Sequence, residues 1–344
     1  MRNHVRRIIV LVGVIVALLL LSGLLIWRSS RHAEIRPFDQ IKDSDVAKLS
    51  LSRGGDEIVL AREGAGWQVT TPKPPDRADK DAVEGLLLAL RGLAIESEVS
   101  SHPESLELYG LNAASATRVA LHDAKGKSLF DGEFGKEAIG YQSAYFRWPE
   151  KPSVYLATGV SPYQVERSSE SFRDHALLPQ AGISWSEIRL KSGARSYILT
   201  RSSAAWTAKP SLPARSADSV VATLFNMRLA QFLPEPEARR YGKFSQAVLM
   251  IEAEGAGKAF ADWTIGAEKP YQGGSPYYRY AVSASRHAGG LVSVYDVESL
   301  LRIVNPKLLA AQNAAKVKAK AKSKAAAKKS KTAAIKKKRL PRGP

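Results

Sequence analysis

The chain has 344 residues with 51 Lys and Arg, 33 Asp and Glu and no cysteine, which excludes disulfide frameworks, thiol catalysis and cysteine-ligated metal. Residues 306–344 hold 14 basic and no acidic side chains, whereas residues 41–305 hold 31 of each. The net charge of +18 thus describes mainly the C-terminal end, so the high basic content does not indicate a nucleic-acid-binding folded body.

The N-terminal segment has the composition of a membrane anchor. Ile8–Trp27 is an uncharged run of about 20 residues, and a helix of that length spans roughly 30 Å, the thickness of a bilayer's hydrocarbon core. It is longer than the apolar region of a cleaved signal peptide, and Trp27 suits a membrane interface. We therefore expect a signal anchor and stalk over residues 1–40, with the rest of the chain periplasmic.

The first folded stretch begins with a predicted hairpin. Apolar residues at 49, 51 and 58–60 flank Gly54-Gly55, as in two antiparallel strands joined by a tight turn. Gly66-Trp67-Gln68-Val69 continues as a third strand, which the prolines at 72, 74 and 75 end. Asp79 is predicted to cap the following helix, whose apolar face is formed by Val83, Leu86, Leu87, Leu90 and Leu93.

Further strands and a short helix follow in the same half of the chain. Residues 118–121 and 128–134 predict a second hairpin, and residues 144–148 and 154–156 two more strands. Ser161-Pro162-Tyr163-Gln164 has the pattern of a capping box with proline at the first helical position.

The sequence pattern of residues 49–93, with its predicted strands, Trp and helix in the same order, occurs a second time at Ile188–Phe232. At an offset of 139 positions, two sets of residues correspond: Leu49, Leu51, Gly54, Leu60, Arg62, Trp67, Ala78, Asp79, Leu90 and Leu93 with Ile188, Leu190, Gly193, Leu199, Arg201, Trp206, Ala217, Asp218, Leu229 and Phe232. The pattern predicts an α+β fold of two duplicated, mostly antiparallel sheet-plus-helix domains over 41–180 and 181–305.

The end of the second copy is predicted from weaker matches. Ser293-Val294-Tyr295 corresponds to Ser153-Val154-Tyr155 and is expected to be a strand, with Asp296 capping the last helix. Residues 306–344 are rich in Lys and Ala, and we expect a disordered basic tail there.

No catalytic or metal-binding constellation is recognisable, so neither a cofactor nor a metal is predicted. Tyr271, Tyr277, Tyr278 and Tyr280 are candidates for a glycan or peptide groove, and ordinary strand packing is the alternative. Trp67 and Trp206 are expected to pack within their own domains, with sugar stacking as the alternative, and Asp79 and Asp218 to cap helices.

A series of short motifs marks the first copy: Gly66-Trp67-Gln68-Val69, Pro72, Ala78-Asp79, Tyr109-Gly110-Leu111, Gly135 and Val154-Tyr155-Leu156. Together these motifs resemble the bacterial family DUF4340, a domain of unknown function, in two tandem copies over residues 44–305. The second copy departs from the pattern at Tyr241-Gly242-Lys243 and at Val294-Tyr295-Asp296. The resemblance implies a membrane-anchored envelope protein, accessory to an ABC-type transporter, and it implies no catalytic residues.

We therefore expect a non-enzymatic, membrane-anchored periplasmic binding or scaffold protein that serves export or envelope assembly. One alternative is a protein that binds cell-wall or polysaccharide polymers, with the basic tail holding anionic envelope polymers. Another is a hydrolase whose site is built from loops. The expected partners are the inner membrane and a membrane-protein complex, and nucleic acid only if the topology is inverted.

Overall fold

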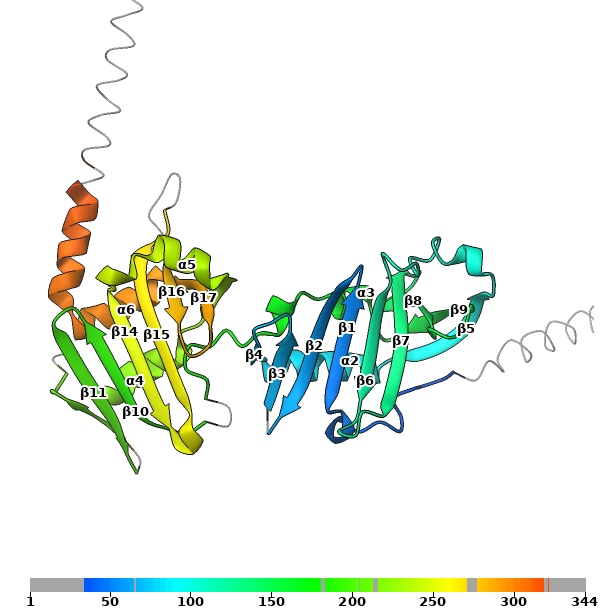
Figure 1. Cartoon of the computed structure of the whole chain (residues 1–344), viewed down its shortest axis with the longest axis horizontal. Coiled ribbons are helices and arrows are strands. Elements are labelled where there is room, and N and C mark those ends of the chain that lie inside the picture. Colours follow the sequence, from blue (N-terminus) through cyan, green and yellow to red (C-terminus); the bar gives the residue numbers. More distant parts are fainter. Residues whose placement is uncertain are drawn as a thin grey trace, which may run out of the picture. The chain divides into compact units, whose positions relative to one another are not determined.

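The computed structural model describes residues 34–64, 66–180, 183–203, 205–212, 216–270, 277–318 and 321. The chain separates into two compact units, Met1–Asp174 (unit 1) and His175–Pro344 (unit 2). The sequence placed the boundary between residues 180 and 181, a few residues later than this division. Each unit is built on one antiparallel sheet with its own hydrophobic core (Figure 1).

The sheet of unit 1 has nine strands. In spatial order they are β4 (Asp76–Arg77), β3 (Gly66–Thr71), β2 (Asp56–Glu63), β1 (Lys48–Arg53), β6 (Thr117–His122), β7 (Ser128–Glu137), β8 (Ser143–Arg147), β9 (Val154–Thr158) and β5 (Ala94–Ser100).

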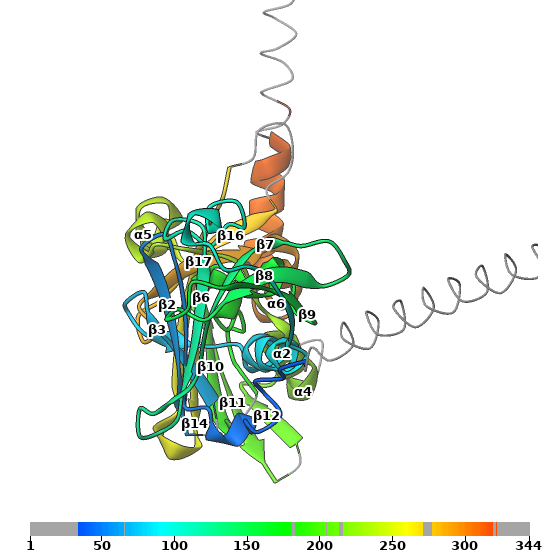
Figure 2. The ribbon, with the colours of Figure 1, turned by 90° about the vertical axis from the view of Figure 1, so that its right-hand side faces the viewer.

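Local sequence explains the first hairpin and the main helix of this unit. Gly54 and Gly55 both have positive φ, at 57° and 95°, which the two-residue turn between β1 and β2 requires. Helix α2 (Lys80–Arg91) begins at Asp79, whose carboxylate accepts the backbone N–H groups of Asp81 and Ala82. Its buried face, Val83, Leu86, Leu87 and Leu90, joins the core under the sheet (Figure 2). A one-turn helix, α3 (Pro162–Val165), follows β9.

The sheet of unit 2 has eight strands. In spatial order they are β12 (Ala205–Lys209), β11 (Arg195–Ser202), β10 (Trp185–Ser192), β14 (Leu249–Gly255), β15 (Phe260–Glu268), β16 (Tyr278–Ser283), β17 (Ala288–Ser293) and β13 (Leu229–Leu233). The helices α4 (Ala217–Asn226), α5 (Glu235–Gly242) and α6 (Val294–Val304) accompany it, and residues 306–318 form a further helix after α6. The apolar faces of α4 and α6 bury Val220, Leu224, Leu300 and Leu301 in the core of the unit.

The two sheets share one strand order, and β4 is the only described strand of unit 1 without a counterpart in unit 2. The offset of 139 holds for β1 and β2 against β10 and β11, where Leu51 pairs with Ile58 and Leu190 with Tyr197. It fails at the helices: Leu90 lies in α2, whereas Leu229 and Phe232 lie in strand β13. The predicted correspondence of Leu90 and Leu93 with Leu229 and Phe232 was therefore wrong, because α4 begins two residues earlier than the offset of 139 requires and is 10 residues long where α2 has 12.

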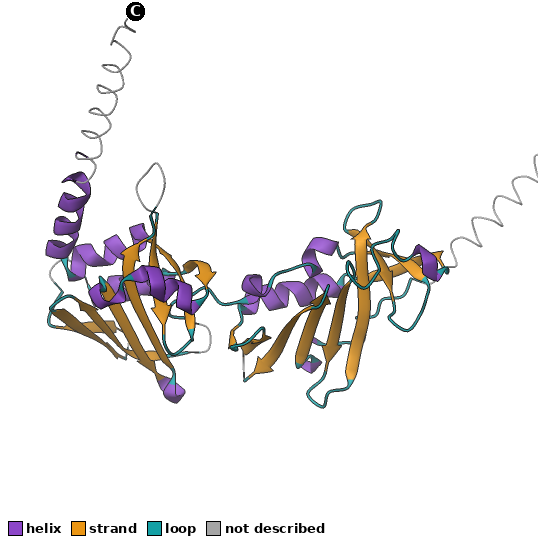
Figure 3. Ribbon diagram, turned by 45° about the horizontal axis from the view of Figure 1, so that its top comes forward, coloured by secondary structure: helices purple, strands orange, loops and turns teal. Residues whose placement is uncertain are grey.

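The predicted fold class, α+β with an N-terminal transmembrane helix as signal anchor, is corrected. The described structure is mostly antiparallel β-sheet, and its few helices are short and cover sheet faces (Figure 3). In the described ranges no helix combines the length and the apolar character needed to cross a bilayer. The apolar segment Ile8–Trp27, on which the membrane prediction rested, lies outside the described residues.

The disordered tail was also predicted too early in the chain. Residues 306–318 are helical, and Leu309 is buried in the core of unit 2. Gln312 accepts a 3.0 Å hydrogen bond from Arg279, and Lys316 forms ion pairs with Glu268 and Glu298 at 2.8 and 3.3 Å. Side-chain contacts therefore fix this helix, although its composition alone predicts disorder.

The predicted strand at Ser293-Val294-Tyr295 is instead the start of α6. Ser293 is the helix N-cap, and its hydroxyl accepts the backbone N–H of Tyr295 at 3.2 Å. Asp296 therefore lies inside the first turn and does not cap the helix. The β-branched and aromatic residues that suggest a strand are here the first helical residues, because the serine cap is a stronger local signal.

Candidate functional site

The predicted tyrosine groove is only partly within the described structure. Tyr271 lies outside the described residues. Tyr277 and Tyr278 are exposed at the start of β16, with 62% and 39% of their surface accessible. Two of the four predicted side chains are thus exposed.

Tyr280 is in a different environment, because it is buried against α5. Its ring stacks on that of Tyr241, with centroids 6.1 Å apart. Burial, together with the nearby Glu237 and Tyr241, raises the pKa of the Tyr280 phenol above its ordinary value. Tyr280 therefore packs the unit and does not line a surface shared with Tyr277.

The repeated tryptophans lie on β3 and β12. Trp67 is buried in the core of unit 1, and the guanidinium of Arg62 lies 4.7 Å from its ring centroid. Trp206 is partly buried against the core of unit 2. Trp67 is inaccessible to a sugar ring, so its contacts are those of a packing residue.

The two repeated aspartates have different roles. Asp79 caps α2, as predicted. In α4 the cap is Ser216, and the Asp218 carboxylate accepts the backbone N–H of Trp206 at 2.9 Å instead. The capping prediction for Asp218 was wrong, because the chain enters α4 two residues before it. Among the described residues, no group of three or more His, Asp or Glu side chains is placed to hold a metal ion.

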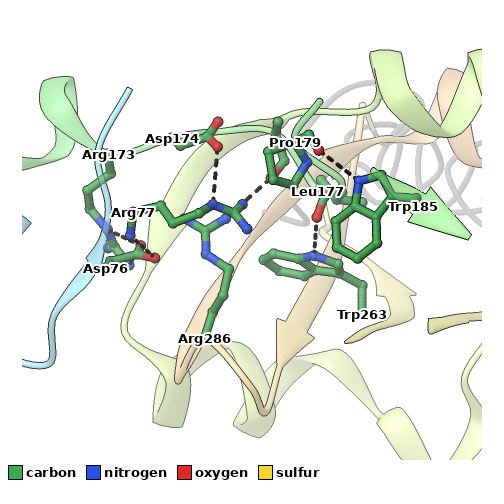
Figure 4. Close-up of polar contacts among 10 residues, drawn as sticks. Asp76, Arg77, Arg173, Asp174, Leu177, Pro179, Trp185, Trp263 and Arg286 are labelled. Atoms are coloured by element: carbon green, nitrogen blue, oxygen red, sulfur yellow. Dashed lines mark hydrogen bonds and ion pairs between the residues drawn. The ribbon is translucent and has the colours of Figure 1, made fainter. Parts of the chain in front are cut away.

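The last residues of unit 1 are held by ion pairs to β4. Arg173 Nη2 lies 2.6 Å from the buried carboxylate of Asp76, and Asp174 lies 3.3 Å from Arg77 Nε (Figure 4). Asp76 is itself 7% exposed. These paired charges fix the end of the unit against its short edge strand.

The first residues of unit 2 are held by side-chain donors to backbone carbonyls. Trp185 Nε1 donates to Pro179 O at 2.7 Å, Trp263 Nε1 to Leu177 O at 3.0 Å, and Arg286 Nη1 to Ala176 O at 3.3 Å (Figure 4). Both indoles are almost completely buried, so each donor needs such a partner. Sequence reasoning missed this arrangement, since neither tryptophan belongs to the repeated positions.

The strongest candidate for a binding site is a cavity of about 520 Å³ in unit 1, also absent from the sequence-based candidates. It lies between the β1–β2 hairpin and the segment after α3. The lining is formed by Leu51, Ser52, Arg53, Asp56, Glu57, Ile58, Pro72, Thr117, Val165, Glu166, Arg167, Ser168 and Ser169. Its size is that of small-ligand sites, which combine an apolar wall with a few polar groups.

At this cavity one charged pair is formed, whereas one buried hydroxyl has no hydrogen-bond partner among the described residues. Arg53 Nη1 forms an ion pair with Glu166 Oε2 at 2.7 Å. Thr117 is 2% exposed, and its hydroxyl has no hydrogen-bond partner in the described part of the chain. A buried hydroxyl without a partner costs about 1–3 kcal/mol, so this group calls for an explanation.

In unit 2, buried side chains occupy the position that corresponds to this cavity. Arg53 is the last residue of β1, and Ser192 is the last residue of the equivalent strand β10. Glu166 is the C-cap of α3, and Asn305 is the C-cap of α6, the helix that follows the last hairpin strand of unit 2. Asn305 Nδ2 donates to Ser192 O at 2.9 Å, and both residues are buried. The residues at these two places therefore form an ion pair beside the cavity in unit 1, and a buried hydrogen bond between uncharged groups in unit 2.

Thr117 also differs from its counterpart. It is the first residue of β6, two positions before Val119, which pairs with Leu51. In unit 2 the residue two positions before the partner of Leu190 is Leu249, which is completely buried. A leucine thus stands in unit 2 where unit 1 keeps an unsatisfied hydroxyl.

Comparison with known proteins identifies a family without an assigned activity. Residues 67–243, just over half of the chain, match the family model described as "Domain of unknown function (DUF4340)". That match is one continuous span from β3 of unit 1 to the end of α5 in unit 2. No curated protein and no solved structure matches the chain. The chain belongs to the DUF4340 family.

Proposed function

We propose that the protein is a non-enzymatic binding protein whose ligand site is the cavity of unit 1. The observation that carries this proposal is the difference between two equivalent places in one chain. Arg53, Thr117 and Glu166 border an open cavity, whereas Ser192, Leu249 and Asn305 are buried in the same positions of unit 2.

Stability alone would favour the arrangement of unit 2. Filling a core position with leucine buries apolar surface, worth about 25 cal/mol per Å², and leaves no unsatisfied hydroxyl. Binding sites commonly keep such locally unfavourable groups, because the groups become satisfied only when a ligand is present. The polar lining of unit 1 fits that pattern.

Solvent mapping tests this proposal without knowledge of the ligand. Propan-2-ol is titrated into the full-length chain with labelled Ile, Leu and Val methyl groups, followed by NMR. We expect Leu51, Ile58 and Val165 to shift at lower alcohol concentration than Leu190 and Val304. Shifts spread evenly over both units would contradict a dedicated site in unit 1.

A paired substitution gives a second test. Thr117→Val removes the unpartnered hydroxyl at nearly constant shape and should stabilise unit 1 by about 1 kcal/mol. Thr70 is the matched control, because its hydroxyl donates to Val59 O at 3.2 Å and Thr70→Val loses that bond. If Thr117→Val destabilises the protein in denaturant unfolding, the hydroxyl has a structural role and the proposal fails.

We also propose that the two units arose by tandem duplication. The shared strand order and the shared offset of the first two strands support this. Deleting each unit separately and following the folding of the other by circular dichroism tests it, since duplicated domains are expected to fold independently.

The periplasmic location and a membrane-protein complex as partner stay predictions. An alkaline phosphatase fusion after Pro344 tests the location, because the enzyme is active only outside the cytoplasm. Fluorescence of a reporter fused at the same place, without phosphatase activity, would contradict it. Co-purification with a transporter tests the partner.

A further inference from the structure

We propose that the unit 1 cavity, taken as the ligand site of the proposed function, binds an aliphatic ammonium group, carried by a free diamine or by a lysine side chain. The inference rests on the charges at the cavity that have no partner, on the unsatisfied hydroxyl of Thr117, and on the apolar residues beside them.

The net formal charge of the cavity lining is negative. Two guanidinium groups line it, but Arg53 is paired with Glu166. Arg167 donates to Ala82 O and Ser171 O and lies 4.5 Å from the centroid of the Phe172 ring.

Asp56 and Glu57 make no ion pair with any described residue, and both are exposed at the rim. Arg167 keeps its formal charge, because its hydrogen-bond acceptors are neutral carbonyl oxygens. The lining therefore holds three carboxylates and two guanidinium groups, which is a formal charge of −1. A cationic ligand gains from this imbalance, and an anionic ligand is repelled.

The hydroxyl of Thr117 supplies a second, independent feature. It is buried at the cavity and lacks a partner among the described residues. A hydroxyl oxygen has two acceptor lone pairs, and an ammonium group has three N–H donors and no acceptor. An ammonium ligand would therefore supply the donor that this hydroxyl lacks.

The apolar part of the lining suits an alkyl chain. Leu51 and Val165 are buried core residues, and Ile58 and Pro72 complete the wall. Leu51 and Ile58 are cross-strand partners on β1 and β2, and Arg53 and Asp56 are the next pair on the same face. The face thus runs from apolar to charged, as a methylene chain ending in an ammonium group requires.

Unit 2 provides an internal control for this charge pattern. The strand pairing places Arg195 opposite Ser192 and Ser196 opposite Lys191, where unit 1 has Asp56 opposite Arg53 and Glu57 opposite Ser52. Both carboxylates are therefore absent from the filled copy, and one is replaced by a cation.

Two ammonium probes and two controls test the proposal on the full-length chain by methyl NMR. The probes are 1,5-diaminopentane and the peptide acetyl-Ala-Lys-Ala-amide; the controls are pentane-1,5-diol and glutarate. We expect at least one probe to give saturable shifts at Leu51, Ile58 and Val165, and neither control to do so. Binding by the diamine alone identifies a free amine ligand, and binding by the peptide alone a lysine side chain.

Matched variants separate recognition from general electrostatics. The double variant Asp56→Asn/Glu57→Gln should weaken the binding probe at least tenfold. Glu104→Gln/Glu107→Gln removes the same charge from exposed positions outside the cavity lining and should leave affinity within twofold.

Equal binding of the diol, or equal loss in both double variants, would overturn the ammonium assignment. Absence of ammonium binding, with propan-2-ol still mapping to the cavity, would overturn the ligand class and leave the proposed function standing. Absence of both would contradict the proposed function itself.

Discussion

The backbone N–H of Trp206 donates a 2.9 Å hydrogen bond to the carboxylate of Asp218, so a side chain from α4 covers an outward N–H group of β12. β12 has a neighbouring strand on one side only, at the edge of the unit 2 sheet. In unit 1 the equivalent strand, β3, is covered by the two-residue strand β4. The same edge is therefore protected by different means, and unprotected edges promote association between chains.

Removing the Asp218 carboxylate should expose the backbone N–H of Trp206 to solvent at the edge of the sheet. We expect Asp218→Ala to speed amide hydrogen exchange at Trp206 several-fold, because the N–H loses its acceptor. Asp218→Asn keeps an acceptor oxygen and should exchange at nearly the original rate. Equal protection of Trp206 in all three proteins would contradict this role for Asp218.

The buried guanidinium of Arg279 should make unit 2 sensitive to its acidic partner. Arg279 is 3% exposed; Nη2 lies 2.5 Å from Glu268 Oε1, and Nη1 donates to Gly266 O at 3.1 Å. Burial lowers the pKa of Arg279 from its ordinary value, yet the group stays charged. Glu268→Gln removes the carboxylate that is hydrogen-bonded to this charge and should cost about 3 kcal/mol in the free energy of unfolding.

Two further variants test that explanation. Lys316 bonds the same carboxylate from the C-terminal helix but is 36% exposed, so Lys316→Ala should cost less than about 1 kcal/mol. Arg279→Met removes the buried charge and should cost less than Glu268→Gln. Denaturant unfolding in which Arg279→Met is the more damaging change would count against an uncompensated charge as the cause.

Asp262 should make unit 2 weaker in acid. Burial on its own raises the pKa of this carboxyl, but hydrogen bonds from Ser285, Ala284 and Ser283 outweigh burial and hold it below the ordinary value. A depressed pKa contributes stability above the unfolded-state value, and this is lost as pH falls through the folded-state value. We expect Asp262→Asn to be destabilising at pH 7 and progressively less so below about pH 4.

The comparison is made by thermal unfolding across that range. Ser285→Ala is the milder control, because the backbone N–H groups of Ser285 and Ala284 still bond the carboxylate. A destabilisation by Asp262→Asn that stays constant between pH 7 and about pH 3 would show that ionisation is not its source.

Two glycines in unit 1 should respond in opposite directions to alanine. Gly85 is exposed in α2 and has open space where the Cβ of an alanine would lie, so Gly85→Ala should stabilise the unit by about 1 kcal/mol. Gly159 has a φ of 83°, and its Cβ would lie 1.8 Å from the carbonyl oxygen of Gly92. Gly159→Ala should therefore lower the melting temperature markedly, and a neutral result would contradict the close approach of these two backbones.

Local features of the sequence determined most elements and several of their ends. The glycine pair at 54–55 selects a two-residue hairpin turn, and Asp79 caps α2 because its carboxylate reaches the first free N–H groups of its own helix. The capping box at Ser161 and Gln164 opens α3 for the same reason. These signals act within a few residues, so they can be recognised without knowledge of the rest of the chain.

Only the tertiary structure decided the features that depend on distant residues. Thr117 is a cavity residue because the fold brings it beside Arg53 and Glu166, which are far from it in sequence, and its buried hydroxyl finds no partner among the described residues. Residues 306–318 form a fixed helix because Arg279, Glu268 and the core of unit 2 hold them, although Lys and Ala alone predict disorder. Burial and partner charges are set by long-range packing, which local periodicity does not encode.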